Sequence, residues 1–188
     1  RWRSFRYLGS TVQSNGECVI EVKKRVQAGW SGWRRVAGVI SDRSARVKGK
    51  VYRTLVRPAM LYGLETVALS KRQEVKLEVA ELKMLRLLGV MRMDRIRNEF
   101  IRGTVHVGRF GDKVREVRLR WFGHVQRRDM GYIGRRMLRM EPPGRRKRGR
   151  TRRRFLDVVR KDMQVVGLKE EDVEDRGVWR RMIRCGDP

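Results

Sequence analysis

The chain has 188 residues, and its 48 Lys and Arg against 21 Asp and Glu give a formal net charge of +27 at pH 7. A hydrophobic fraction of 40% is too high for a disordered basic tail, and 37% charged residues leave no apolar window of about 18 residues for a membrane span. Two cysteines exclude a disulfide framework or a cysteine-based zinc finger, and they indicate an intracellular location, nuclear or cytoplasmic. We therefore predict one folded domain or two small ones with a polyanionic partner, first of all RNA or DNA.

The N-terminal residues predict a short β element followed by a long helix. Residues 4–12 are rich in β-favouring side chains and are followed by a Ser-Asn-Gly turn signal, which indicates a hairpin or a strand. From residue 19 to residue 40 apolar side chains recur at intervals of three or four, which is the stripe of an amphipathic helix. Ser14 and Glu17 have the spacing of a capping box at its start.

A second helix is predicted over residues 45–61, with Pro58 distorting its end. Its polar face is basic, because four cations recur at intervals of four and three: Arg46, Lys50, Arg53 and Arg57. Such a face is either solvated or in contact with phosphates, and the sequence leaves both interpretations open.

The rest of the chain is predicted to be mainly helical. Ser70 caps a third helix that extends to about residue 88, with an acidic face of Glu74, Glu78 and Glu81 that we expect to pair with basic neighbours rather than bind a cation. Further apolar stripes predict helices over residues 94–102, 112–128, 132–140, 155–166 and 173–183. Most of the tryptophans lie on these stripes and are expected in the core.

A dense basic run follows the breaker at residues 142–144. Residues 145–154 contain eight cations, and this density favours phosphate binding or nuclear import over plain solvation. The cations are Arg145, Arg146, Lys147, Arg148, Arg150, Arg152, Arg153 and Arg154.

Residues for catalysis or metal binding are missing from the sequence. His106 and His124 are the two histidines, and neither has a cysteine or acidic residue at metal-ligand spacing. No glycine-rich phosphate loop of the Walker or Rossmann kind is present. We therefore predict no catalytic residues, no metal site and no cofactor in this chain.

Four segments resemble, in order, the reverse transcriptases of non-LTR (LINE-type) retrotransposons, and they are closest to the RTE or BovB-like clade. Residues 5–10 (FRYLGS) resemble the F-x-Y-L-G element that follows the catalytic palm, and residues 57–66 (RPAMLYGLET) resemble the R-P-x-L-L-Y-G-x-E-T stretch of the thumb region. Residues 118–127 (RLRWFGHVQR) resemble the R-L-R-W-F-G-H-V segment of the C-terminal extension, and residues 144–150 (GRRKRGR) resemble its basic run.

The resemblance implies a mainly α fold with three parts. Residues 1–13 would be the end of the palm with a primer-grip-like β element, residues 14–105 a thumb-like helical region, and residues 106–188 a basic helical extension. The primer grip would consist of Phe5, Tyr7, Leu8 and Gly9.

The same resemblance implies that the chain is part of a longer polymerase and is not an enzyme alone. Its partners would be a template–primer duplex of RNA or DNA and an upstream palm and endonuclease, and Mg²⁺ is expected only with that palm. No membrane partner is expected. The alternative is a non-enzymatic basic helical module, derived from a decayed retroelement, that binds acidic proteins or serves nuclear import.

Overall fold

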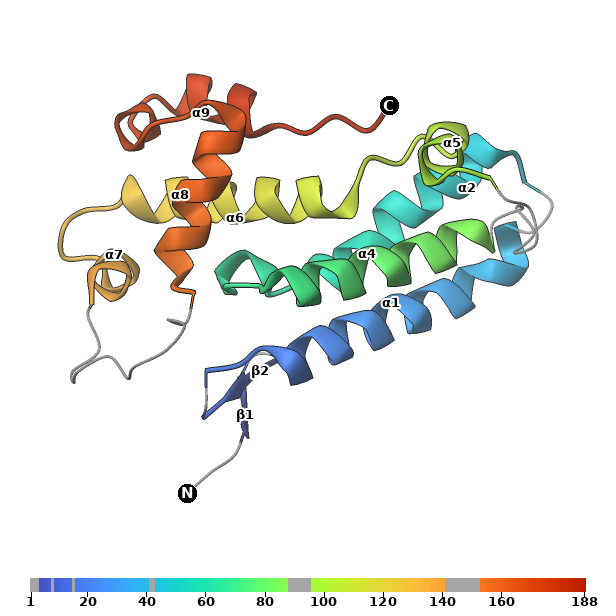
Figure 1. Ribbon diagram of the computed structural model, residues 1–188, viewed down its shortest axis with the longest axis horizontal. Helices are drawn as coiled ribbons and strands as arrows, with labels where there is room; N and C mark the ends of the chain where they lie inside the picture. Colours follow the sequence, from blue (N-terminus) through green and yellow to red (C-terminus); the bar gives the residue numbers. More distant parts are fainter. Residues whose placement is uncertain (1–3, 8, 15, 41–42, 88–95, 141–152) are drawn as a thin grey trace. The chain divides into compact units, whose positions relative to one another are not determined.

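Helices dominate the computed structural model, which describes residues 4–7, 9–14, 16–40, 43–87, 96–140 and 153–188 (Figure 1). Within these ranges a two-stranded antiparallel sheet is followed by helices, so the predicted mainly α fold with a short N-terminal β element is confirmed. Two compact units divide the chain: unit 1 comprises residues 1–64, 69–114 and 185–188, and unit 2 comprises residues 65–68 and 115–184. Unit 1 thus extends beyond residue 105, because Val107, Phe110 and Val114 are buried in it.

The hairpin consists of β1 (Ser4–Tyr7) and β2 (Ser10–Gln13), with Phe5 opposite Val12. Helix α1 (Val19–Ile40) follows it. The predicted capping box of Ser14 and Glu17 is wrong, since the helix begins too late for Ser14 to be its N-cap. Instead, the side-chain oxygen of Gln13 accepts a hydrogen bond of 2.9 Å from the N–H of Ile20 in the first turn.

The predicted helix over residues 45–61 is interrupted by a π-helical turn. This segment consists of α2 (Ala45–Val51), the π-helical segment η1 (Tyr52–Val56) and α3 (Arg57–Leu61). Pro58 explains the interruption, because it has no N–H for the preceding turn and its ring crowds the carbonyl four residues before it. A π turn contains more residues than an α turn, so side chains after it are rotated about the axis relative to those before it.

Unit 1 is completed by the 3-10 segment η2 (Leu64–Thr66), α4 (Lys71–Arg86) and α5 (Asn98–Thr104). As predicted, Ser70 is the N-cap residue of α4, and its N–H donates a hydrogen bond of 2.8 Å to the side chain of Gln73. Helices α1 and α4 run side by side (Figure 1). Their facing side chains, with those of η1 and α3, form a core that contains Trp33, Tyr52, Val56, Met60, Leu77 and Met84.

Unit 2 is built on helix α6 (Phe110–Gln126), and the boundary between the two units crosses this helix. Its other elements are α7 (Ile133–Arg139), α8 (Phe155–Val166), the 3-10 segment η3 (Glu170–Val173) and α9 (Arg176–Ile183). Helix α9 begins three residues later than predicted because Asp175 caps it, accepting hydrogen bonds of 2.8 and 2.9 Å from Gly177 and Val178. The core of this unit contains Leu119, Phe122, Val159, Met163, Leu168, Val173, Trp179 and Ile183.

The structure bears on two further expectations. Trp33 and Trp179 are buried, which confirms their predicted core positions, whereas Trp30 and Trp121 are only half-buried. Within the described ranges, no helix combines the length and the apolar character that crossing a membrane would require.

Candidate nucleic-acid interface

Two buried side chains of α1 hold the primer-grip-like hairpin. Glu21, which is 1% exposed, accepts a hydrogen bond of 2.6 Å from the backbone N–H of Thr11. Arg25, one turn later, pairs with Glu21 at 2.8 Å and donates a hydrogen bond of 2.8 Å to the carbonyl oxygen of Gly9. Because a buried ion pair binds two backbone groups of the hairpin, the position of the hairpin on α1 is set by charge-assisted hydrogen bonds as well as by packing.

Arg25 also links the hairpin to Tyr62, the residue after α3. The guanidinium carbon lies 5.1 Å from the centroid of the Tyr62 ring, which is a cation–π distance. Gly9 has a φ of 80°, and a Cβ placed on it would lie 3.7 Å from a carbon of the same ring. The two segments that resemble the palm end and the thumb therefore lie against each other in unit 1.

The other predicted primer-grip residues are Phe5, Tyr7 and Leu8. Phe5 is 55% exposed, so its ring does not belong to the core. Leu8 and the side chain of Tyr7 lie outside the described residues.

The predicted basic face on residues 46–57 is only partly present. Arg46 and Lys50 are exposed on α2, whereas Arg53 is half-buried and donates a hydrogen bond of 2.7 Å to the carbonyl oxygen of His106. Arg57 is 4% exposed, so its assignment as a phosphate ligand is wrong. Because the π turn of η1 lies between Lys50 and Arg57, the two do not share a face as they would on a regular α-helix.

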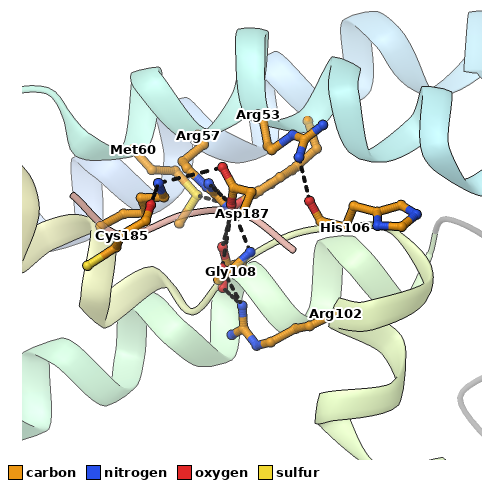
Figure 2. A network of polar contacts seen from close by, with 11 residues as sticks. Arg53, Arg57, Met60, Arg102, His106, Gly108, Cys185 and Asp187 are labelled. Atoms are coloured by element: carbon orange, nitrogen blue, oxygen red, sulfur yellow. Dashed lines mark hydrogen bonds and ion pairs between the residues drawn. The ribbon is translucent and has the colours of Figure 1, made fainter. Parts of the chain in front are cut away.

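Arg57 is instead the centre of a buried polar network (Figure 2). Its guanidinium donates hydrogen bonds of 2.7 Å to the Asp187 carboxylate and 3.1 Å to the carbonyl oxygen of Gly108. Asp187 also accepts a hydrogen bond of 2.8 Å from the N–H of Gly108 and lies 3.6 Å from the Lys113 ammonium. The network therefore attaches residues 185–188 to the interior of unit 1.

Glu81 of α4 belongs to the same network. It is fully buried and lies 2.5 Å from Arg102, 3.8 Å from Arg57 and 3.1 Å from the hydroxyl of Tyr52. Burial raises the pKa of Glu81 despite the two guanidinium groups, and burial with the nearby Glu81 charge raises the pKa of Tyr52. Glu81 thus pairs with basic neighbours, as predicted for the acidic face of this helix.

The pH dependence of unit 1 should contain a contribution from Asp187. Burial alone would raise the pKa of Asp187, but the hydrogen bonds from Arg57 and Gly108 and the charges of Arg57 and Lys113 lower it below 3.8. The stabilisation is therefore present above pH 3.8 and is lost as the pH falls through the lowered pKa. Denaturant unfolding at about pH 6 and about pH 2.5 should show Asp187→Asn less stable than the parent at the higher pH, with a smaller difference at the lower. An equal difference at both values would contradict the pairing.

The predicted basic run lies mostly outside the described residues. Arg145, Arg146, Lys147, Arg148, Arg150 and Arg152 fall in residues 141–152, which the structure does not describe. Arg153 and Arg154 are described, and both are exposed immediately before α8.

Sequence reasoning missed a basic cleft in unit 2, with a volume of about 1140 Å³. One wall is the C-terminal part of α6 and the residues that follow it, and it presents Arg120, His124, Arg127 and Arg128. The other wall is α9 with its C-cap residue, and it presents Arg176, Arg180, Arg181 and Arg184. The signal was available, since Arg176, Arg180 and Arg184 recur at intervals of four, but only the apolar stripe over residues 173–183 entered the prediction.

Trp179 and Gly123 bring the two walls together. The Trp179 ring is fully buried, and its Nε1–H donates a hydrogen bond of 3.1 Å to the carbonyl oxygen of Leu119 in α6. A Cβ on Gly123 would overlap Nε1 of that ring and lie 2.9 Å from its Cε2, so only glycine permits this approach of α9 to α6. The W-F-G-H segment thus has a structural role in forming the cleft.

No metal site is seen in the part of the chain that the structure describes, where no group of three or more His, Cys, Asp or Glu side chains is placed to hold an ion.

Comparison with protein-family models, with curated proteins and with solved structures gives no match for this chain. The resemblance to retrotransposon reverse transcriptases therefore stays a prediction from the sequence motifs.

Proposed function

We propose that this chain is the nucleic-acid-binding C-terminal part of a non-LTR retrotransposon reverse transcriptase. In this proposal it holds a template–primer duplex of RNA or DNA through phosphate contacts, and it does not polymerise by itself. The metal-binding carboxylates for nucleotidyl transfer, and with them Mg²⁺, would belong to a palm that precedes Arg1 in a longer chain.

The observation that carries this proposal is the contact between the hairpin and the residue after α3. A primer grip has to be held rigidly at the base of the thumb, because displacement of a primer end by about 1 Å is costly for the reaction. The Glu21–Arg25 pair holds the backbone of Thr11 and Gly9 in this way, and Arg25 stacks on Tyr62. The Phe5 side chain in the same hairpin is 55% exposed.

The charge of the chain supports the same proposal. With a net charge of +27 and exposed cations such as Arg46 and Lys50, the protein attracts polyanions whatever their sequence. Contacts of this kind are made to the phosphate backbone, so little sequence preference is expected.

Binding to a labelled RNA–DNA hybrid should weaken steeply as salt is added. Each phosphate that a Lys or Arg neutralises contributes about −0.9 to the slope of log K against log salt for duplex DNA, and we expect several such contacts. A fluorescence titration at several salt concentrations measures this slope for hybrids of two unrelated sequences, which should behave alike.

An acidic peptide of matched charge is the control for that titration. A slope near zero for the hybrid, or binding of the peptide as tight as binding of the hybrid, would contradict the proposal and favour the interaction module for acidic proteins.

In a longer chain that includes an active palm, Gly9→Val should lower primer extension by about a hundredfold while duplex binding is nearly unchanged. At the φ of 80° a β-branched residue is strained, so the hairpin and the primer end that it positions would shift. Gly38→Val is the matched control, since a Cβ there meets nothing within 4 Å. Equal losses of extension in the two variants, or equal losses of binding and extension in Gly9→Val, would exclude the primer-grip role.

A further inference from the structure

We infer that the cleft between α6 and α9 in unit 2 binds the phosphate backbone of a single nucleic-acid strand. This inference rests on the proposed function, because it assigns a site to the nucleic acid that the chain is proposed to bind. Three of its arginines, Arg176, Arg180 and Arg181, belong neither to the sequence motifs nor to the predicted basic run.

The cleft has a strong excess of positive charge. Its lining contains seven arginines and one acidic residue, Glu116, which is buried and already paired with Arg120. Arg127 donates a hydrogen bond of 2.8 Å to the carbonyl oxygen of Val173 and is therefore held in place at the edge of the cleft. Burial, and after it the nearby charge of Arg176, lower the pKa of Arg127, so an anion placed between these two guanidinium groups would relieve their repulsion.

The three arginines of α9 and its C-cap residue, Arg184, are available for a ligand. All four are exposed, and among the described residues none of them has an acidic side chain within ion-pair distance. Arg180 follows Arg176 by four positions, so their side chains emerge about 6 Å apart along the same side of the helix. A row of guanidinium groups with this spacing suits successive phosphates, each of which accepts two parallel N–H hydrogen bonds from one arginine.

The size and lining of the cleft select a single strand held by its backbone. A volume of about 1140 Å³ is slightly more than the ~300–1,000 Å³ of pockets for small ligands, which accommodates a few nucleotides but not a duplex. Among the described lining residues Trp179 is the one Phe, Tyr or Trp, and its ring is fully buried; the other ring is the imidazole of His124. Because the indole offers no face to a base and seven arginines dominate the lining, the strand would be held mainly by its phosphates and without regard to sequence.

The test compares two charge-matched triple variants of the whole 188-residue chain. The cleft variant is R176Q/R180Q/R181Q, and the control is R136Q/R139Q/K161Q, whose three exposed cations belong to the same unit but do not line the cleft. The probe is a short single-stranded oligonucleotide of mixed sequence, used as DNA and as RNA, and circular dichroism checks that both variants are folded.

We expect the cleft variant to reduce the slope of log K against log salt by about 2, since each phosphate contact contributes about 0.7 for a single strand, and the control to change it by less than about 0.7. Equal effects of the two variants, with binding retained by the parent chain, would overturn the cleft assignment and leave the proposed function intact. Absence of salt-dependent binding in the parent chain would overturn the proposed function itself.

Arginine modification of the parent chain gives a second readout that needs no variant. With phenylglyoxal and mass spectrometry, the oligonucleotide should protect Arg176, Arg180 and Arg181 from modification but leave Arg136 and Arg139 reactive. Uniform protection of both groups, or equal protection by a polyglutamate of matched charge, would overturn the assignment.

Discussion

Arg57→Met is expected to lower the free energy of unfolding of unit 1 by about 3 to 5 kcal/mol, the usual cost of breaking a buried ion pair by removing one partner. The substitution keeps an unbranched side chain of helix-forming character but removes the donors that bind Asp187 and the carbonyl oxygen of Gly108. It also removes one of the two guanidinium groups beside the buried carboxylate of Glu81. Denaturant unfolding followed by circular dichroism measures the effect.

Lys50→Met is the matched control for Arg57→Met. Lys50 is exposed on α2 and belongs to the same predicted basic face, so its removal should change stability by no more than about 0.5 kcal/mol. It should instead reduce the salt slope of nucleic-acid binding by about 0.9 if it contacts a phosphate. A stable Arg57→Met variant with a reduced salt slope would show that Arg57 binds phosphate and would contradict its place in the buried network.

Gly49→Ala is expected to lower the free energy of unfolding by about 3 kcal/mol or more, at the upper end of the usual cost of overpacking. A Cβ on Gly49 would overlap the carbonyl oxygen of Val105 and lie 2.8 Å from its carbonyl carbon. Because the obstacle is backbone and not the end of a flexible side chain, the added methyl group forces α2 away from the residue that follows α5. The same unfolding measurement tests this expectation.

Gly38→Ala, in α1, is the control that separates packing from helix propensity. Outside the local backbone of α1, no described atom lies within 4 Å of the added Cβ, so the substitution should stabilise the protein by about 0.5 to 1 kcal/mol through the better helix propensity of alanine. Similar effects of the two substitutions would mean that α2 does not approach Val105 as closely as the structure shows.

Local sequence signals predicted most helices well, because the apolar stripe of a helix depends on residues that are close to one another in the sequence. The apolar stripe of residues 19–40 coincides with α1, and that of residues 155–166 coincides with α8. Errors arose where a side chain from outside the signal intervened: Gln13 binds the first turn of α1 in place of Ser14, and Asp175 sets the start of α9. The π turn before Pro58 was not predicted, because the sequence indicated a distortion without specifying its form.

The basic character of this protein and its mainly helical fold were determined by its sequence alone, since charge and apolar periodicity can be read without knowing which helices meet. Only the tertiary structure decided which cations are available to a ligand. Arg57 is enclosed because Asp187, which is 130 residues away, supplies its counter-charge, whereas Arg176 and Arg180 remain exposed beside α6. The physical reason is that burial of a charge depends on a partner brought close by packing, and no local pattern in the sequence contains that information.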